Sequence, residues 1–296
     1  MSRELGRNTT RGHPYRACMA QVQAAARARQ PRRPRTLLDP WLWPYVRTQL
    51  AEGCSPEQMA GRLQRASPDD MRKQLSAETI YVGLYVLPRG TLRRELLAAL
   101  RQARKTRRPR ARGTDRRGQL PNMTPMAERP AEGATRTVPG HWDGDRMKGA
   151  RNAAVGTLVA RTTRLVLLVK MEGTDARSAR QGFTKTLRHV PAPLRKTLTY
   201  DRGNERAEHA RLAQRLAIRI FFADPYSPWQ RGTNENTNGL LRQYWPKGTD
   251  WSGYTQRELN AIAHRLTTRP RKCLNFATPL EVYTHLRHDS PVALGT

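Results

Sequence analysis

The sequence predicts an α/β fold, a mixed sheet with flanking helices, preceded by a small all-α region. Residues 36–100 carry apolar side chains at helical spacing, whereas from Val138 onward short β-branched runs alternate with helical segments. A basic stretch rich in proline and glycine separates the two parts. The expected divisions are a basic N-terminal segment (1–35), a helical region (36–100), a basic flexible linker (101–137), an α/β core (138–288) and a tail (289–296).

Two helices are predicted in the helical region. Ser55 supplies a hydroxyl N-cap, Pro56 suits the first turn, and Gln58 can return a hydrogen bond to the cap. Ser76 caps a second helix after a polar connection. The pair fits a helix-turn-helix with a long connection or a small structural bundle, and the pattern alone does not separate these two interpretations.

Arg107 and Arg108 belong to the basic run that opens the predicted linker. The run has no apolar periodicity, and such a run is commonly only a solvated surface. Here like-charge repulsion keeps it extended, and a phosphate backbone nearby would order it. We therefore expect Arg107 and Arg108 to contact DNA.

The region after Val138 has the pattern of a sheet. Segments 153–160 and 165–171 are apolar and β-branched, with a polar turn between them, and predict an antiparallel hairpin. Further segments predict a helix at 175–189, a strand at 197–201, a helix at 205–216 and a strand at 218–223. With a first strand around Asp145, this is the order expected of a ribonuclease H-like domain, although periodicity leaves other α/β folds open.

The net charge indicates a polyanionic partner. The 296 residues include 54 Lys and Arg against 24 Asp and Glu, a formal charge of +30. The excess positive charges repel one another in the folded chain, which opposes folding. Binding to nucleic acid is favourable instead, because it releases counterions from the phosphates. The competing partner, a membrane, is disfavoured because no run approaches about 18 apolar residues and no signal peptide is recognised. Cys18, Cys54 and Cys273 form no Cys-x-x-Cys pair, so we expect a reduced cytoplasmic, nucleoid-associated protein.

Three acidic segments carry the expected chemistry, at 142–145, 199–205 and 224–236. Taking Asp145, Asp201 and Glu235 gives an Asp–Asp–Glu set without His or Cys, which suits Mg²⁺ because this ion prefers oxygen ligands. Two such ions about 3.5–4 Å apart can neutralise a scissile phosphate and activate the attacking hydroxyl. A bare count of acids has little specificity, and the flanking residues supply it.

These segments closely resemble transposases of the insertion-sequence-30 family. Further matches are 55–63, 76–81, and a closing motif at 269–274 and 278–281, so the resemblance runs along nearly the whole chain. It implies an Asp–Asp–Glu enzyme with a ribonuclease H-like core that cleaves element ends and joins the freed 3′-hydroxyl to target DNA. It also implies two Mg²⁺ ions, with Mn²⁺ able to substitute, and double-stranded DNA partners, the terminal inverted repeats and the target. Joining two ends implies a homodimer or higher oligomer on DNA, and the helical region is then expected to bind DNA.

The resemblance also bears on individual acids. Asp143 and Asp145 are two apart and share one face of a strand, so spacing does not choose between them. The family pattern selects Asp145, which leaves Asp143 as a residue behind the ligands or an alternative carboxylate. Glu205, one helical turn before His209, either lines the same pocket or forms an ordinary exposed helical pair.

Four further residues are expected to contact DNA. Positions 235 and 242 share a helix face, so Arg242 would hold a phosphate beside the metal site, and Arg231 would do so from the preceding turn. Charge balance around the acids is the alternative for both arginines. Trp229, in a proline-rich turn, would stack on an unpaired base, and Lys247 completes the set.

The first eight residues allow two interpretations of the N-terminus. Residues 1–8 resemble the tail of the family's first helix-turn-helix, with its preceding helices absent. Either translation begins upstream of Met1, or this is a truncated, catalytically inactive copy that acts only as a DNA-binding protein or repressor. An RNA-cleaving ribonuclease H is a third interpretation, but it leaves the basic helical region unexplained.

Overall fold

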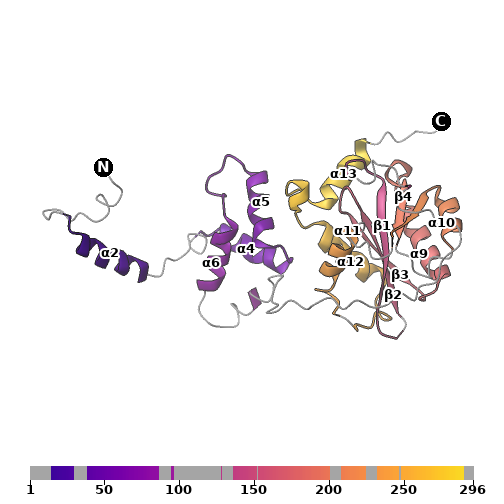
Figure 1. Ribbon diagram of the computed structural model, residues 1–296, viewed down its shortest axis with the longest axis horizontal. Helices are drawn as coiled ribbons and strands as arrows, with labels where there is room; N and C mark the ends of the chain where they lie inside the picture. The colour runs from indigo at the N-terminus through magenta and orange to yellow at the C-terminus, as the bar shows by residue number, and fades with distance from the viewer. Residues whose placement is uncertain are drawn as a thin grey trace.

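The computed structural model describes residues 15–29, 39–86, 95–96, 128, 136–151, 153–200, 208–224, 232–246 and 248–289. A helical part comes first along the chain and a sheet covered by helices follows, in the order that the sequence predicts (Figure 1). None of the described helices combines the length and the apolarity needed to cross a bilayer.

The helical part contains α2 (Ala17–Arg29), α4 (Leu42–Ala51), α5 (Pro56–Ala66) and α6 (Ala77–Val86). The predicted start of α5 is confirmed: the Gln58 N–H donates to Ser55 Oγ (3.3 Å), and the Ser55 N–H donates to Gln58 Oε1 (2.9 Å). Ser76 Oγ likewise accepts the N–H of Thr79 at 3.0 Å before α6. One apolar core joins α4, α5 and α6, and we call residues 39–86 the helical unit. Its buried members include Val46, Leu50, Met59, Ile80 and Leu84.

Five strands form one mixed sheet in the order β3-β2-β1-β4-β5. They are β1 (His141–Lys148), β2 (Ala154–Ala160), β3 (Val166–Met171), β4 (Thr197–Tyr200) and β5 (Arg219–Phe222). The predicted hairpin is confirmed, because β2 is antiparallel to both β1 and β3. Strands β4 and β5 run parallel to β1. Three antiparallel strands followed by parallel strands reached through helices is the ribonuclease H-like arrangement.

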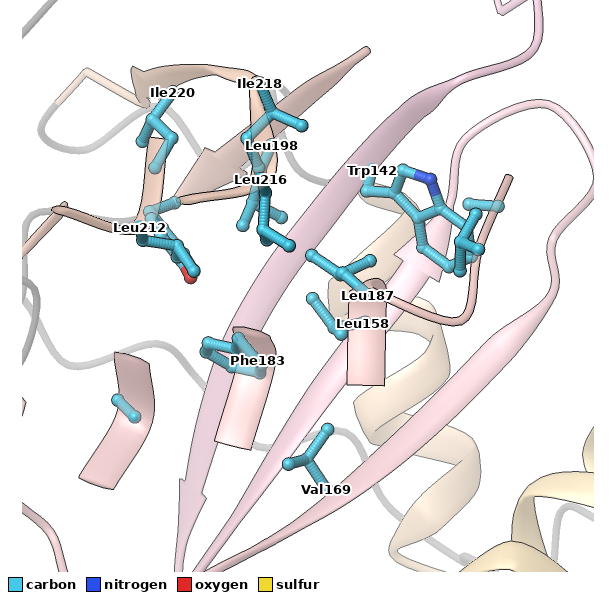
Figure 2. Close-up of a cluster of buried hydrophobic side chains, with 14 of the residues drawn as sticks. Trp142, Leu158, Val169, Phe183, Leu187, Leu198, Leu212, Leu216, Ile218 and Ile220 are labelled. Carbon is cyan, nitrogen blue, oxygen red and sulfur yellow. The ribbon is translucent and has the colours of Figure 1, made fainter. Parts of the chain in front are cut away.

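Helices cover both faces of the sheet. On one face α9 (Ala176–Leu187) and α10 (His209–Leu216) enclose a buried cluster that includes Trp142, Phe183 and Leu198 (Figure 2). On the other face α11 (Gly232–Leu241) and α12 (Gln256–Thr267) enclose a second cluster around Trp245 and Trp251. Strand β2 is buried along its whole length because both of its faces are covered.

The remaining elements are the short helices η2 (Ala192–Leu194) and η5 (Lys272–Leu274) and the last helix, α13 (Pro279–Asp289). In Figure 1 the layer with α11 and α12 faces the helical unit, whereas α9 and α10 lie on the far side of the sheet. The face of the sheet that carries α11 is therefore the one nearer to the helical unit.

Candidate active site

Four of the predicted site residues fall within the described parts of the chain, namely Asp143, Asp145, Glu235 and Arg242. Those outside the described residues are Asp201, Glu205, Trp229, Arg231, Lys247, Arg107 and Arg108. The four described residues come from β1 and from α11 with its continuation. Helix α11 packs on β1 and β2, so these residues belong to one face of the sheet.

Asp145 lies on β1 opposite Thr157 of β2 and is half-buried. Its Oδ2 accepts a hydrogen bond of 2.8 Å from Nδ2 of Asn238 on α11. Its Oδ1 accepts the backbone N–H of Arg146, also at 2.8 Å. One donor on each oxygen sets the orientation of the carboxylate, and the donor on α11 ties this helix to the strand.

Gly144 sits between the two aspartates of β1. An added Cβ at this position would lie 2.5 Å from Cε1 of Tyr200, the last residue of β4. Glycine therefore allows the Tyr200 ring to pack directly on β1, on the face opposite to Asp143 and Asp145. This close approach brings the end of β4 against the part of β1 that carries the acids.

Helix α11 carries Glu235 in its first turn. Asn234 is buried, and its Oδ1 accepts a hydrogen bond of 3.4 Å from Thr157 Oγ1, whereas Glu235 is exposed. Residues three apart on a helix are neighbours, so Glu235 lies one turn from Asn238, the residue that contacts Asp145. The Asn238 contact therefore joins the helix of Glu235 to the strand of Asp145.

Asp143 has a different environment from Asp145. Its side chain is fully buried, and Arg161 Nη1 lies 3.0 Å from Oδ1 and 3.3 Å from Oδ2. Arg161 follows β2 and is only 4% exposed. The pair offsets the desolvation that an isolated buried charge would suffer. Sequence reasoning missed Arg161, because it lies in the predicted turn and its partner belongs to another strand.

Positive charge collects beside the start of α11. Arg164 Nη1 donates to Thr233 Oγ1 in the first turn of this helix. Burial, together with the nearby charges of Arg164 and Arg161, lowers the pKa of Arg136, and Asp143 opposes this shift. The three arginines are therefore close enough to interact electrostatically, and Arg164 adds positive charge at a helix end that is already positive.

Arg242 and Asn238 belong to the end of α11. The N–H of Arg242, which is half-buried, donates to the carbonyl oxygen of Asn238 at 3.1 Å, so the helical turn continues past Leu241. Sequence reasoning missed Asn238 as a site residue. The signal was present, because an amide one helical turn after Glu235 is expected to share its side of the helix.

The described residues around Asp145 suit a hard cation. Within the described ranges no group of three or more His, Cys, Asp or Glu side chains comes together, and Asp201 lies outside those ranges. Asn238 Oδ1 is buried and has no hydrogen-bond partner among the described residues, while its Nδ2 holds the Asp145 carboxylate. Carboxylate and amide oxygens are the ligands that Mg²⁺ prefers, so the donor set fits a divalent ion.

Several curated transposases align with nearly the whole chain. The chain is 53% identical over 284 residues to the transposase for insertion sequence element IS1086 of Cupriavidus metallidurans, covering 95% of this chain and 84% of the relative. It is 40% identical over 287 residues to transposase InsI for insertion sequence element IS30A of Escherichia coli, covering 95% and 74%. It is 34% identical over 300 residues to the transposase for insertion sequence element IS4351 of Bacteroides fragilis, covering 99% and 88%.

Other comparisons add little. No protein-family model matches the chain. The catalytic core domain of BIV integrase is 17% identical with a TM-score of 0.39, over 50% of this chain and 95% of that one, a likeness too low to support an argument. The three transposases carry the assignment, because each aligns with almost all of this chain. The protein therefore belongs to the insertion-sequence-30 family of transposases.

Proposed function

We propose that Asp145, Asp201 and Glu235 form the catalytic site of this transposase and hold two Mg²⁺ ions, with Mn²⁺ able to substitute. The reaction is cleavage at the ends of an insertion sequence and transfer of the freed 3′-hydroxyl to target DNA. The observation that carries this proposal is the hydrogen bond from Asn238 to Asp145, because it ties the helix of Glu235 to the strand of Asp145.

The register of the sheet supports Asp201 as the second acid. Asp201 follows Tyr200, the last residue of β4, and β4 runs parallel to β1 with Thr199 opposite Asp143. The same register, extended by two residues, would pair position 201 with position 145. The resemblance to the family's Asp–Asp–Glu pattern selects the same residue.

We assign the ligand role on β1 to Asp145 rather than to Asp143. Arg161 already neutralises Asp143 in a buried ion pair, so a cation would have to displace a guanidinium to bind there. Asp145 is half-buried and faces α11. Asp143 thus holds Arg161 against β1, behind the metal ligands. We also propose that Glu205 lines the same pocket as the metal ligands.

The residues divide the work between metal binding and DNA binding. Divalent ions, when bound, neutralise the scissile phosphate and activate a water or a 3′-hydroxyl. Asn238 keeps the Asp145 carboxylate in one orientation, which reduces the reorganisation needed for ion binding. Arg164, which contacts the first turn of α11, and the nearby Arg136 contribute positive potential there, which attracts the DNA backbone toward the acids.

We propose that the DNA partners are the terminal inverted repeats of the element and the target duplex. The formal charge of +30 supports broad attraction to phosphates. Because two ends are joined to one target, at least a dimer is proposed on the DNA. The proposed DNA contacts are Arg231, Arg242, Trp229, Lys247, Arg107 and Arg108.

A strand-transfer assay on DNA that carries the element's own ends tests this function. Joined products are expected with Mg²⁺ or Mn²⁺ and are expected to disappear on chelation with EDTA. Asp201→Asn is expected to bind end DNA but to join none of it. Joining by Asp201→Asn at the wild-type rate would remove Asp201 from the proposed site.

Asn238→Ala is expected to lower the strand-transfer rate about ten- to a hundredfold, because residues that orient metal ligands typically contribute this much. Raising the Mg²⁺ concentration is expected to recover part of the loss. The matched control is Asn236→Ala, an exposed amide on the same helix, which is expected to leave the rate unchanged. Equal rates for the two variants would show that the contact with Asp145 has no role in the reaction.

A further inference from the structure

The closing motif of the sequence takes no part in the proposed chemistry, yet residues 269–281 lie against the helical unit. We call residues 269–281 the docking segment. Polar contacts join the two across more than 200 positions of sequence. They are Gln58 Nε2 to Pro270 O at 2.6 Å, Arg65 Nη1 to Asn275 O at 2.9 Å, Lys272 Nζ to Glu57 Oε1 at 2.6 Å, Arg62 Nη1 to Glu281 Oε2 at 2.9 Å, and Arg269 Nε to Glu52 O at 3.0 Å.

One face of α5 makes most of these contacts. Gln58, Gly61, Arg62 and Arg65 have the spacing i, i+3, i+4, i+7, which places them along a single stripe of the helix. All four touch the docking segment. Met59 lies outside this stripe and belongs to the apolar core of the helical unit. Helix α5 therefore has one face for its own unit and another for the catalytic core.

Gly61 is the point of closest packing in this interface. A Cβ added to Gly61 would lie 2.4 Å from ring carbons of Phe276, a distance that real contacts do not show. Gly61 has helical backbone geometry, so no local requirement calls for glycine there. The absence of a side chain is explained by the Phe276 ring, and this shape match is specific to the docking segment.

Arg269 extends the interface toward the active-site helix. Its side chain is 3% exposed, and its guanidinium lies over the Tyr244 ring, 5.5 Å from the centroid. The same guanidinium bonds the Tyr244 hydroxyl and Gln243 Oε1, just beyond α11. Its Nε donates a hydrogen bond to the carbonyl oxygen of Glu52 at the end of α4. One buried side chain thus connects the helical unit to the turn that directly follows the helix of Glu235 and Asn238.

We propose that the docking segment is an intramolecular binding site for the helical unit, and that it holds this unit at a fixed position relative to the acids. The proposal rests on the proposed function, cleavage and joining of DNA, and on the expectation from the family resemblance that the helical unit binds DNA. Docking occupies the outer face of α5 and leaves α6 accessible, where Tyr81, Val82 and Tyr85 are exposed. DNA held by the helical unit is then presented to the active site in a defined geometry.

Gly61→Ala in the full chain is the first test, because alanine favours the α5 helix and strains only the contact with Phe276. Amide hydrogen exchange in residues 269–281 is expected to accelerate about tenfold or more as the segment loses its cover. Gly253→Ala is the matched control, because nothing lies within 4 Å of its added Cβ, and it is expected to exchange like the wild type. Unchanged exchange in Gly61→Ala would overturn the docking.

The functional arm measures end cleavage and end binding in the same variants. Gly61→Ala is expected to bind end DNA within about twofold of the wild type but to cleave it about tenfold more slowly, since misplacement of a substrate costs rate more than affinity. Equal loss in binding and cleavage would overturn the positioning role. The exchange arm needs no catalysis, so an inactive wild type would count against the proposed function and leave the docking result standing.

A charge exchange tests whether the contact forms within one chain. Arg62→Glu and Glu281→Arg are each expected to slow cleavage several-fold, and the double variant in one chain is expected to recover to within about threefold. An equimolar mixture of the two single variants is expected to stay slow. Recovery in the mixture would show that one copy docks on another and would overturn the intramolecular arrangement.

Discussion

Strand transfer is expected to fall on the order of a thousandfold when Glu235 is changed to Gln or Asp145 to Asn. Each change keeps the size of the side chain and removes the charge that an ion needs as a ligand. DNA binding is expected to survive, because the loss of a negative charge does not weaken attraction to phosphates. The rate of joining and the affinity for end DNA, measured on the same preparations, separate chemistry from binding.

The matched control for this prediction is Glu172→Gln, an exposed carboxylate just beyond β3. It removes the same charge from the same domain at a residue outside the proposed site, and is expected to leave joining unchanged. A loss in Glu172→Gln equal to that in Glu235→Gln would mean that net charge, not a particular ligand, controls the rate. Full activity in Glu235→Gln would contradict the assignment of the third acid.

Arg161→Met is expected to lower the free energy of unfolding by about 3–5 kcal/mol, the usual cost of leaving one partner of a buried ion pair alone. The reason is local: Asp143 is fully buried, and Arg161, its ion-pair partner, is 4% exposed, so water cannot easily replace the guanidinium. Urea denaturation of the variant against the wild type measures the difference. Arg177→Met, at an exposed position of α9, is the control and is expected to change stability little.

A double variant separates the ion pair from packing. Asp143→Leu combined with Arg161→Met replaces the pair by apolar side chains and is expected to recover most of the lost stability. If the double variant is as unstable as Arg161→Met alone, the guanidinium contributes through its aliphatic stem and other contacts. The assignment of Asp143 as the buried partner would then need another basis.

Local patterns predicted the parts of the fold that depend on neighbours in sequence. The capping pair of Ser55 and Gln58 forms as expected, because both partners lie within one helical turn. The hairpin of β2 and β3 forms for the same reason, since its strands are joined by a short polar turn. The mixed sheet followed from the order of the segments, with the family resemblance selecting the ribonuclease H-like arrangement.

The choice between Asp143 and Asp145 shows where pattern reasoning ends. A two-residue spacing puts both carboxylates on one face of a strand, so no periodicity separates them. The structure distinguishes them by partners from elsewhere in the chain, Arg161 for Asp143 and Asn238 for Asp145. No residue near Arg161 in the sequence indicates that it pairs with Asp143. Asn238, in contrast, follows Glu235 by one helical turn, and its place in the site was predictable from helical spacing.

The closing motif had a family match but no predicted role. Its contacts reach residues of the helical unit that lie more than 200 positions away, and no composition or spacing rule links segments so far apart. Gly61 illustrates the difficulty, because a glycine inside a helix reads from sequence as a local weakness. Only the ring of Phe276 against it explains why a side chain is absent.

Manganese bound to a complex of the protein with its element ends gives the most direct test, by anomalous X-ray scattering. Two Mn²⁺ ions are expected, and Asp145, Asp201 and Glu235 are the residues whose carboxylates would hold them. No ion is expected to contact Asp143, which stays paired with Arg161. Ions bound at other carboxylates, with Glu235 turned away from Asp145, would contradict this assignment.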